Sequence, residues 1–282
     1  MSLKKRKNAD RIFYVMLVLA IIFTLFILVL LFSDIFKKGL SHLNLDFFNS
    51  FSSRFPNKSG IRAALLGSLW TVILSVLIAT VLGIGTAIYL EEYAPKNKFT
   101  SILKVNISNL AGIPSVIYGI LGLSIFVRYL NFGRTIISGS LTLALLILPT
   151  IIVSSQEALK TVPKEMKEGS YALGATKWQT IKKIVLPYSF PGILTGMILG
   201  VSRAFGESAP LVVIGGAASI WFQPKGIFDE FTTLPLQIFN WAARPQAEFQ
   251  NIAAAGIIVL LVLVVIINLT AILLRNRYQD RM

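Results

Sequence analysis

Five stretches of this sequence contain no charged residue and are each long enough to cross a lipid bilayer. They cover residues 12–32, 63–90, 105–127, 135–156 and 252–274. The hydrocarbon core of a bilayer is about 30 Å thick, so a helix that rises about 1.5 Å per residue needs about 20 residues to cross it. A sixth stretch, at about 190–215, is equally apolar but contains glycines, Pro210 and two charges. The sequence therefore predicts an all-α membrane protein with six transmembrane helices.

The composition agrees with a membrane location and excludes several kinds of chemistry. Of the 282 residues, 55% are hydrophobic and only 14% are charged, whereas a soluble domain has about 25% charged residues. The chain has no cysteine, which excludes disulfides, cysteine-ligated metals and thiol catalysis, and His42 is its single histidine. We therefore expect no metal site. The net charge of +14 comes from basic residues beside the apolar stretches, which favours contact with the bilayer rather than with nucleic acid.

The distribution of lysine and arginine predicts the side of the membrane that each loop faces. If the N-terminus is cytoplasmic, cytoplasmic segments hold 17 of these residues and external segments hold nine. This asymmetry favours a cytoplasmic location for both termini. The first stretch is longer than a signal-peptide core and no cleavage pattern follows it, so it is interpreted as a retained anchor. We divide the chain into an anchor helix with an external loop (1–60), a core (61–275) and a cytoplasmic tail (276–282).

Two opposite charges, Arg203 and Glu207, lie within the sixth stretch and are the only charges between Lys183 and Lys225. A charged residue at the centre of a membrane helix costs about 2.5–3.5 kcal/mol, and pairing at i,i+4 recovers at most about 0.5 kcal/mol. One explanation for the pair is a structural lock between neighbouring helices. The other is a transient anion site, in which the planar fork of Arg203 binds an oxyanion. Glu207, beside it on the helix, would then hold Arg203 between substrates.

The segment 157–187 is too polar to cross a membrane, but it has the signals of two short helices. Pro163 suits a first helical turn, Gly174 suits a left-handed helix end, and Thr176 begins a capping box. Pro187 is expected to close the pair. The side chains displayed on these helices are Tyr171, Leu173, Trp178 and Ile181, among six lysines. Two interpretations stay open: an amphipathic loop on the lipid headgroups, or a projection that fits a groove on a cytoplasmic partner.

The run from Gly174 to Pro187 resembles the G-x9-I-x-L-P signature of ABC-importer permeases, which contact their ATPase through this loop. The match is partial, because Glu168-Gly169-Ser170 stands where the family commonly has Glu-Ala-Ala. The residues that the resemblance assigns to ATPase docking are Glu168, Gly169, Tyr171, Leu173, Gly174, Trp178, Ile184, Leu186 and Pro187. It implies a type I ABC-importer permease fold with a cytoplasmic coupling loop.

Longer matches lie at residues 157–178, 111–115, 203–210 and 233–238, within a region of about 60–275. They resemble the PstA-type permeases of phosphate-specific ABC transporters. This resemblance implies a multi-pass subunit of the bacterial or archaeal cytoplasmic (inner) membrane that passes inorganic phosphate. It also implies four partner subunits: one homologous PstC-type permease, two copies of a PstB-type ATPase and an external PstS-type phosphate-binding protein. The chain has no G-x-x-x-x-G-K-[ST] loop, so we expect no bound cofactor and ATP hydrolysis by a partner subunit.

Four further residues bring polar or helix-breaking groups into the membrane region: Ser115, Tyr118, Ser208 and Pro210. Small and helix-breaking residues permit close helix packing, and this is their simpler interpretation. The alternative is that they line or gate the substrate pathway.

Other functions were weighed against phosphate import. A permease for another oxyanion (phosphonate, sulfate or molybdate) has the same requirement for a positive charge in the membrane. An ion-coupled anion carrier would need further ionisable groups in the membrane, which the sequence lacks. An intramembrane enzyme would need a carboxylate pair or a base for a nucleophile, and neither is present, so we predict no catalytic residues.

Overall fold

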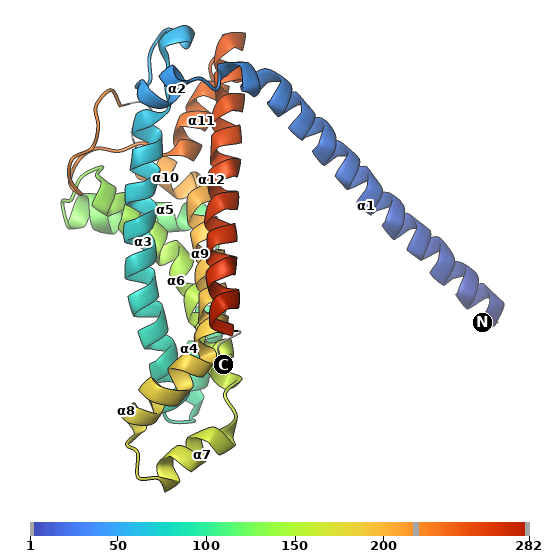
Figure 1. The fold of residues 1–282 in the computed structure, drawn as a ribbon, viewed down its shortest axis with the longest axis vertical. Helices are drawn as coiled ribbons and strands as arrows, with labels where there is room; N and C mark the ends of the chain where they lie inside the picture. Colours follow the sequence, from blue (N-terminus) through green and yellow to red (C-terminus); the bar gives the residue numbers. More distant parts are fainter. Residues whose placement is uncertain (1–2, 217–219, 280–282) are drawn as a thin grey trace.

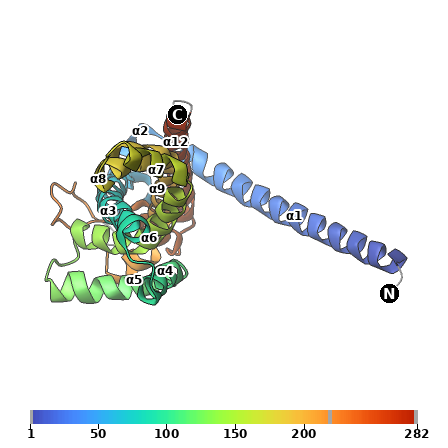
Figure 2. The ribbon, with the colours of Figure 1, turned by 90° about the horizontal axis from the view of Figure 1, so that it is seen from below.

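Long helices run side by side in a bundle, and one helix projects away from it (Figures 1 and 2). The computed structural model describes residues 3–216 and 220–279. The long helices are α1 (Leu3–Gly39), α3 (Arg62–Ile88), α6 (Ile136–Lys160), α9 (Leu186–Gly206) and α12 (Ala247–Gln279). The short ones are α2 (Leu45–Asn49), α4 (Lys98–Leu110), α5 (Ser115–Gly122), α7 (Lys164–Ala172), α8 (Lys177–Thr180), α10 (Ala209–Val213) and α11 (Leu234–Ala242). Three π-helical segments join some of these: η3 (Tyr89–Tyr93), η4 (Leu123–Tyr129) and η5 (Ile181–Val185). The predicted tail at 276–282 lies partly outside the described residues.

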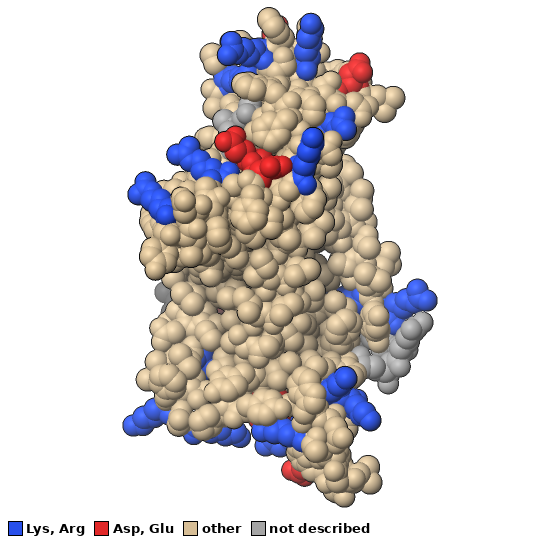
Figure 3. Space-filling model, turned by 90° about the vertical axis from the view of Figure 1, so that its left-hand side faces the viewer, with Lys and Arg blue, Asp and Glu red and all other residues tan. Residues whose placement is uncertain are grey.

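Five continuous helical segments of the described chain are long and apolar enough to cross a membrane. They run over Asp10–His42, Arg62–Tyr93, Ile136–Lys160, Lys177–Gly206 and Ala247–Tyr278. Four of them contain predicted stretches, which confirms those stretches as helices. Figure 3 shows charged side chains gathered toward the two ends of the molecule, with a broad and largely uncharged band between them. This distribution suits a protein whose middle faces lipid.

The predicted span over 105–127 is not one continuous helix but a bent pair of helices. Helices α4 and α5 meet at an angle of 101°, and α5 lies across the long axis of the bundle (Figure 1). Gly112 and Pro114 occupy the break, and Pro114 has an extended backbone (φ −54°, ψ 133°). A proline disfavours helical geometry in the residue before it and lacks the N–H that a continuing helix needs. The count of six spans holds only when this bent pair is taken as one crossing.

Helix α6 is the centre of the bundle. In its most apolar window 67% of the residues are buried, against 33% for the next most buried span. Glycines on the neighbouring helices permit this: a Cβ added at Gly83 of α3 would lie 2.7 Å from Ile151, and one added at Gly196 of α9 would lie 1.7 Å from Ser154 Oγ. Small residues allow membrane helices to approach closely where dispersion contacts drive association. Helices α3, α6 and α9 therefore form a tightly packed core.

Helix α1 is an arm rather than a member of this core. None of its apolar window is buried, and Figures 1 and 2 both show it leaving the bundle. Its last residue touches α12, because a Cβ added at Gly39 would lie 2.7 Å from Ile258. The N-terminal end of α1 and the C-terminal end of α12 both lie toward the end of the bundle that carries α7 and α8 (Figure 1).

The last loop before α12 enters the bundle at the opposite end, which carries α2 and α11. Phe231 is fully buried, and the Leu234 N–H donates a hydrogen bond to Ser68 Oγ on α3 (2.7 Å). Within this loop, the backbone N–H groups of Lys225 and Gly226 donate hydrogen bonds to Asp229 Oδ2. These hydrogen bonds lower the pKa of the Asp229 carboxyl. The loop leads into the short helix α11, and Trp241 of this helix is buried in the core.

Alanine at Gly67 should destabilise the protein because the loop backbone lies directly on this glycine. An added Cβ would lie 2.0 Å from the Thr232 carbonyl oxygen, and a backbone atom cannot rotate away. Overpacking of this kind costs about 1–3 kcal/mol. We expect Gly67→Ala to lower the midpoint of thermal unfolding in detergent by several degrees.

Gly85 in the same helix supplies the matched control, because nothing lies within 4 Å of an added Cβ there. Gly85→Ala should keep the midpoint or raise it, since alanine favours a helix by about 1 kcal/mol over glycine. Equal midpoints for the Gly67 and Gly85 variants would contradict the packing argument.

Candidate functional site

The two intramembrane charges lie where α9 ends. Arg203 is in the last turn of α9, which stops at Gly206, and Glu207 has an extended backbone (φ −89°, ψ 122°). Helix α10 begins two residues later, with Pro210 in its first turn. A helix continuing through this point would place the proline ring against the carbonyl of Gly206 and leave that carbonyl without a donor. The predicted span through residue 215 is therefore broken here, and Arg203 and Glu207 do not share a helical face.

No ion pair joins Arg203 to Glu207 within the described residues, whose four ion pairs lie elsewhere. The prediction that Glu207 sits beside Arg203 is wrong for this conformation, because an i,i+4 pair requires an unbroken helix. Both residues are half-buried. The helix C-terminus favours a cation by about 0.3–1 kcal/mol, which does not offset the cost of about 2.5–3.5 kcal/mol for arginine in a membrane helix. The break therefore holds a guanidinium without a carboxylate partner.

Tyr118 of α5 is a second predicted pathway residue that lies at the end of α9. Tyr118 shares a buried apolar cluster with Ala204 and Phe205, the two residues that follow Arg203. The Tyr118 hydroxyl donates to the Leu110 carbonyl (2.8 Å), so it bridges the bend between α4 and α5. The arginine, the bend and the end of α9 thus form one site.

Pro210 belongs to the same site. A Cβ added at Gly119, the neighbour of Tyr118, would lie 2.7 Å from Pro210 Cα, so α5 and α10 are in backbone contact. Ser115 opens α5 and Ser208 precedes α10, and both are half-buried. No hydrogen bond links either serine to Arg203 in the part of the chain that the structure describes. The structure therefore joins Pro210 to Gly119, the neighbour of Tyr118, and leaves the two serines at the margin.

The second candidate element is the loop that carries α7 and α8, at the far end of the bundle (Figure 1). The predicted helix signals are confirmed: Pro163 precedes α7, Gly174 has a positive φ of 81°, and Thr176 and Gln179 form a reciprocal capping box. A buried hydrogen bond between the hydroxyls of Ser170 and Thr180 (2.9 Å) holds the two helices together. The loop is therefore a built element with a fixed shape.

The residues predicted for docking fall into an exposed group and a packed group. Leu173 is 91% exposed, and Glu168, Gly169, Tyr171, Gly174 and Trp178 are exposed as well. Ile184 and Leu186 are half-buried in a helix, and Ile181 is fully buried, so its predicted display on the surface is wrong. Pro187 does not close the pair, because it lies in the first turn of α9 and the helix runs unbroken from Lys177 to Gly206. The exposed group forms an apolar projection around Leu173.

Sequence reasoning missed two acidic residues that follow α3. Glu91 pairs with Lys104 of α4 (2.7 Å), and Glu92 pairs with Lys167 of α7 (2.5 Å). Their side chains are only 13% and 8% exposed. The sequence does contain one signal for these residues, an acidic pair directly after a long apolar stretch. Their lysine partners lie 13 and 75 residues away along the chain, and no local sequence rule selects those lysines.

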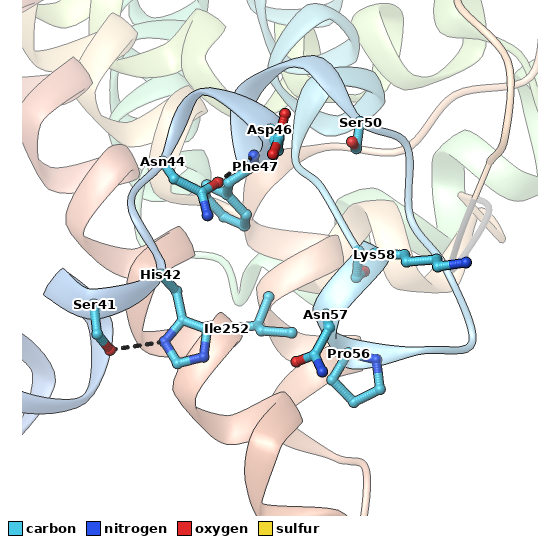
Figure 4. A pocket seen from close by; sticks show the side chains of 11 residues that line it. Ser41, His42, Asn44, Asp46, Phe47, Ser50, Pro56, Asn57, Lys58 and Ile252 are labelled. Atoms are coloured by element: carbon cyan, nitrogen blue, oxygen red, sulfur yellow. Dashed lines mark hydrogen bonds between the residues drawn. The ribbon is translucent and has the colours of Figure 1, made fainter.

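A polar cavity of about 240 Å³ lies at the α2 end of the molecule (Figure 4). His42 and Asn57 line it, and a hydrogen bond of 3.0 Å links His42 Nδ1 to Ser41 Oγ. Among the described residues no group of three or more histidine, cysteine, aspartate or glutamate side chains is placed to hold a metal ion. The cavity is separate from the Arg203 site.

Comparison with known proteins relates this architecture to transport systems. The family model described as the binding-protein-dependent transport system inner membrane component matches residues 79–281, and a domain of unknown function (DUF3333) matches residues 1–44. The chain is 36% identical to the probable ABC transporter permease protein YqgI of Bacillus subtilis, over 87% of each chain. It is 32% identical to the phosphate transport system permease protein PstA of Yersinia pestis, over 94% of this chain and 90% of that one.

Solved structures with the same fold agree with this relationship. A bacterial ABC transporter involved in the import of the acidic polysaccharide alginate aligns over 98% of each chain, with a TM-score of 0.67 and 17% identity. The MetNI methionine ABC transporter in an inward-facing conformation aligns over 77% of this chain and 95% of that one, with a TM-score of 0.61 and 19% identity. At such identities the likeness concerns the fold alone. By the family model and its relatives, the chain belongs to the binding-protein-dependent transport system inner membrane components, and it is a multi-pass ABC-importer permease rather than an enzyme.

Proposed function

We propose that this chain is the PstA-type permease subunit of an ATP-driven importer that moves inorganic phosphate across the cytoplasmic membrane. The observation that carries the proposal is the guanidinium of Arg203, which has no carboxylate partner among the described residues and lies where the membrane helix α9 breaks before the short helix α10. Similarity to PstA proteins, including one of Mycobacterium leprae that is 38% identical over 74% of this chain, supports phosphate as the anion. Non-helical backbone at membrane depth is tolerated where it lines a cavity or packs on protein, and broken helices are common at transport sites.

Arg203 binds the anion in transit. Guanidinium stays charged at all physiological pH values and donates parallel hydrogen bonds that match two phosphate oxygens. Glu207 competes for the same guanidinium when the non-helical backbone between α9 and α10 rearranges, and this competition releases the anion. An arginine with no competitor would retain phosphate for longer than transport allows. Tyr118 and Pro210 border the site where α5 meets α10, and Ser115 and Ser208 flank the pathway beside them.

The loop of α7 and α8 docks an ATPase subunit. Its exposed apolar projection around Leu173 suits a hydrophobic groove, whereas a loop made for lipid headgroups would place its apolar groups toward the membrane end of the helices. ATP is bound and hydrolysed by that partner, because this chain has no phosphate-binding G-x-x-x-x-G-K-[ST] loop. The complete importer contains this chain, a PstC-type permease, two PstB-type ATPases and an external PstS-type binding protein. Both termini of this chain face the cytoplasm.

Reconstitution of the four-component complex in vesicles tests the proposal. We expect uptake of radiolabelled phosphate that requires ATP on the cytoplasmic side and stops when ATP is removed. A hundredfold excess of sulfate, molybdate or a phosphonate should lower that uptake by less than half. If one of those anions lowered the uptake more strongly, that anion would be the substrate instead of phosphate. Uptake by this chain alone, driven by an ion gradient without ATP, would replace the importer with an ion-coupled carrier.

A further inference from the structure

The π-helical segment η3, which follows α3, contacts four other elements through Glu91, Glu92 and Tyr93. Glu92 accepts a hydrogen bond from Lys167 of α7, and Glu91 accepts one from Lys104 of α4 and one from Gln156 of α6 (3.2 Å). The ring of Tyr93, next along the chain, lies under the ammonium of Lys177 of α8, at 4.7 Å. One short segment thus joins the docking loop to the membrane helices.

These two ion pairs are more buried than the other ion pairs that the described residues make. The side chains of the Lys167–Glu92 pair are 22% and 8% exposed, and those of the Lys104–Glu91 pair are 32% and 13% exposed. The Lys38–Asp34 pair, within one helix, is 47% and 58% exposed. Exposed pairs contribute little, whereas removal of one partner of a buried pair leaves an uncompensated charge. Glu91 and Glu92 therefore fix the relative positions of separate elements, which a surface pair does not.

The contacts continue from this segment to the intramembrane site. Lys104 belongs to α4, whose last residue, Leu110, accepts the hydrogen bond from Tyr118. Tyr118 packs with Ala204 and Phe205, the two residues that follow Arg203, and Gly119, the next residue along, packs on Pro210. A continuous series of paired groups therefore runs from α7, through η3 and α4, to the bend and the arginine.

The geometry of η3 suits a segment that changes register. Its turn is wide, with the Ala94 N–H bonded to the Tyr89 carbonyl five residues back. π-Helical turns are rare and occur frequently at functional sites. A shift of this turn by one residue would move both carboxylates together, and with them α7 on one side and α4 on the other.

We propose that Glu91 and Glu92 are positioning residues that pass movement of the ATPase-docking loop to the α4–α5 bend and so to the Arg203 site. This inference rests on the proposed function, because it concerns how ATP hydrolysis drives anion passage. Coupling is distinguished from assembly when the phosphate transported per ATP falls while the ATPase still binds.

Charge exchange between Glu92 and Lys167 provides that test. In the reconstituted complex, Glu92→Lys and Lys167→Glu should each lower the phosphate taken up per ATP hydrolysed by at least fivefold, while the ATPase still copurifies and hydrolyses ATP. The double variant Glu92→Lys/Lys167→Glu restores an attractive pair and should recover at least half of the wild-type ratio. Asp34→Asn removes an exposed pair within one helix and should leave the ratio unchanged. If Glu92→Lys does not assemble, Glu92→Gln, which keeps the side-chain size, takes its place.

A second measurement does not depend on phosphate. Because the chain has no cysteine, spin labels can be placed at Val81 on α3 and Val116 on α5, both of which are exposed. ATP binding should change the distance between the labels in the wild-type complex and in the double variant. In Glu92→Lys the distance should stay unchanged. An unchanged uptake ratio or an unchanged label response in Glu92→Lys would overturn the inference, as would a double variant no better than the single ones. A complex that shows the label response without phosphate uptake would instead overturn only the substrate.

Discussion

Replacement of Arg203 by alanine is expected to lower ATP-driven phosphate uptake by about 100-fold or more. Each hydrogen bond to a charged group contributes about 1.5–3 kcal/mol, and a tenfold change corresponds to about 1.4 kcal/mol, so loss of two such bonds removes transport. Radiolabelled phosphate uptake by the reconstituted complex measures this directly. Complex assembly should persist, because Arg203 makes no ion pair within the described residues that the fold would lose.

Lysine at the same position distinguishes shape from charge. An ammonium is a point charge without the planar fork, so Arg203→Lys should recover only a minor part of the uptake. Arg128→Ala is the matched control, because Arg128 is an exposed arginine at the end of η4 and lies outside the site. We expect its uptake to equal that of the wild type. Full transport by an assembled Arg203→Ala complex would exclude this residue from the mechanism, and full transport by Arg203→Lys would exclude the fork.

The membrane helices were predictable from sequence because their signal is additive. Each of four stretches needs only enough apolar residues in a row, and hydrogen bonding within the helix satisfies the backbone whatever its neighbours do. The coupling-loop helices were predictable for a related reason. The capping box of Thr176 and the left-handed Gly174 are local interactions, complete within a few residues. Hydropathy and capping thus determine the elements without knowledge of the tertiary structure.

The errors occurred where a helix breaks. A run of uncharged residues predicts the same length of helix whether or not it bends, so hydropathy alone does not distinguish the straight α6 from the pair α4 and α5. Pro149 lies inside α6 without ending it, whereas Pro114 coincides with a bend of 101°. The difference depends on Gly112 and on whether neighbouring helices enclose the segment. The assumption that Arg203 and Glu207 share a face failed for the same reason, because it required α9 to continue past Gly206.

The remaining features that could not be predicted from the sequence depend on contacts between distant segments. The pairing of Glu92 with Lys167 spans 75 residues, and a lysine-rich loop offers several equivalent candidates. The exposure of α1 along its length is also a property of the whole assembly rather than of its sequence. The sequence of an apolar helix is equally hydrophobic whether the helix faces lipid or protein.

Aspartate in place of Leu173 is expected to prevent the ATPase subunit from binding and thereby to remove ATP-driven uptake. Leu173 is 91% exposed at the tip of the docking loop, so the substitution has no packing to disturb in this chain. Burial of a leucine at an interface contributes about 1.5–3 kcal/mol, and a carboxylate forced into the same apolar groove leaves an unpaired charge there. Copurification of the ATPase from mild detergent should fall by at least tenfold, while the thermal unfolding midpoint of this chain stays unchanged.

Leu45→Asp provides the matched comparison for that result. Leu45 is 80% exposed but begins α2, at the opposite end of the bundle. The same substitution there should leave both copurification and uptake at wild-type levels, because the ATPase does not reach that end. If Leu173→Asp retained the ATPase in full, the loop would instead be a headgroup-binding element. In that case a fluorophore attached beside Leu173 should report an apolar environment in vesicles that contain this chain alone, since an interfacial segment buries its apolar side chains among the headgroups.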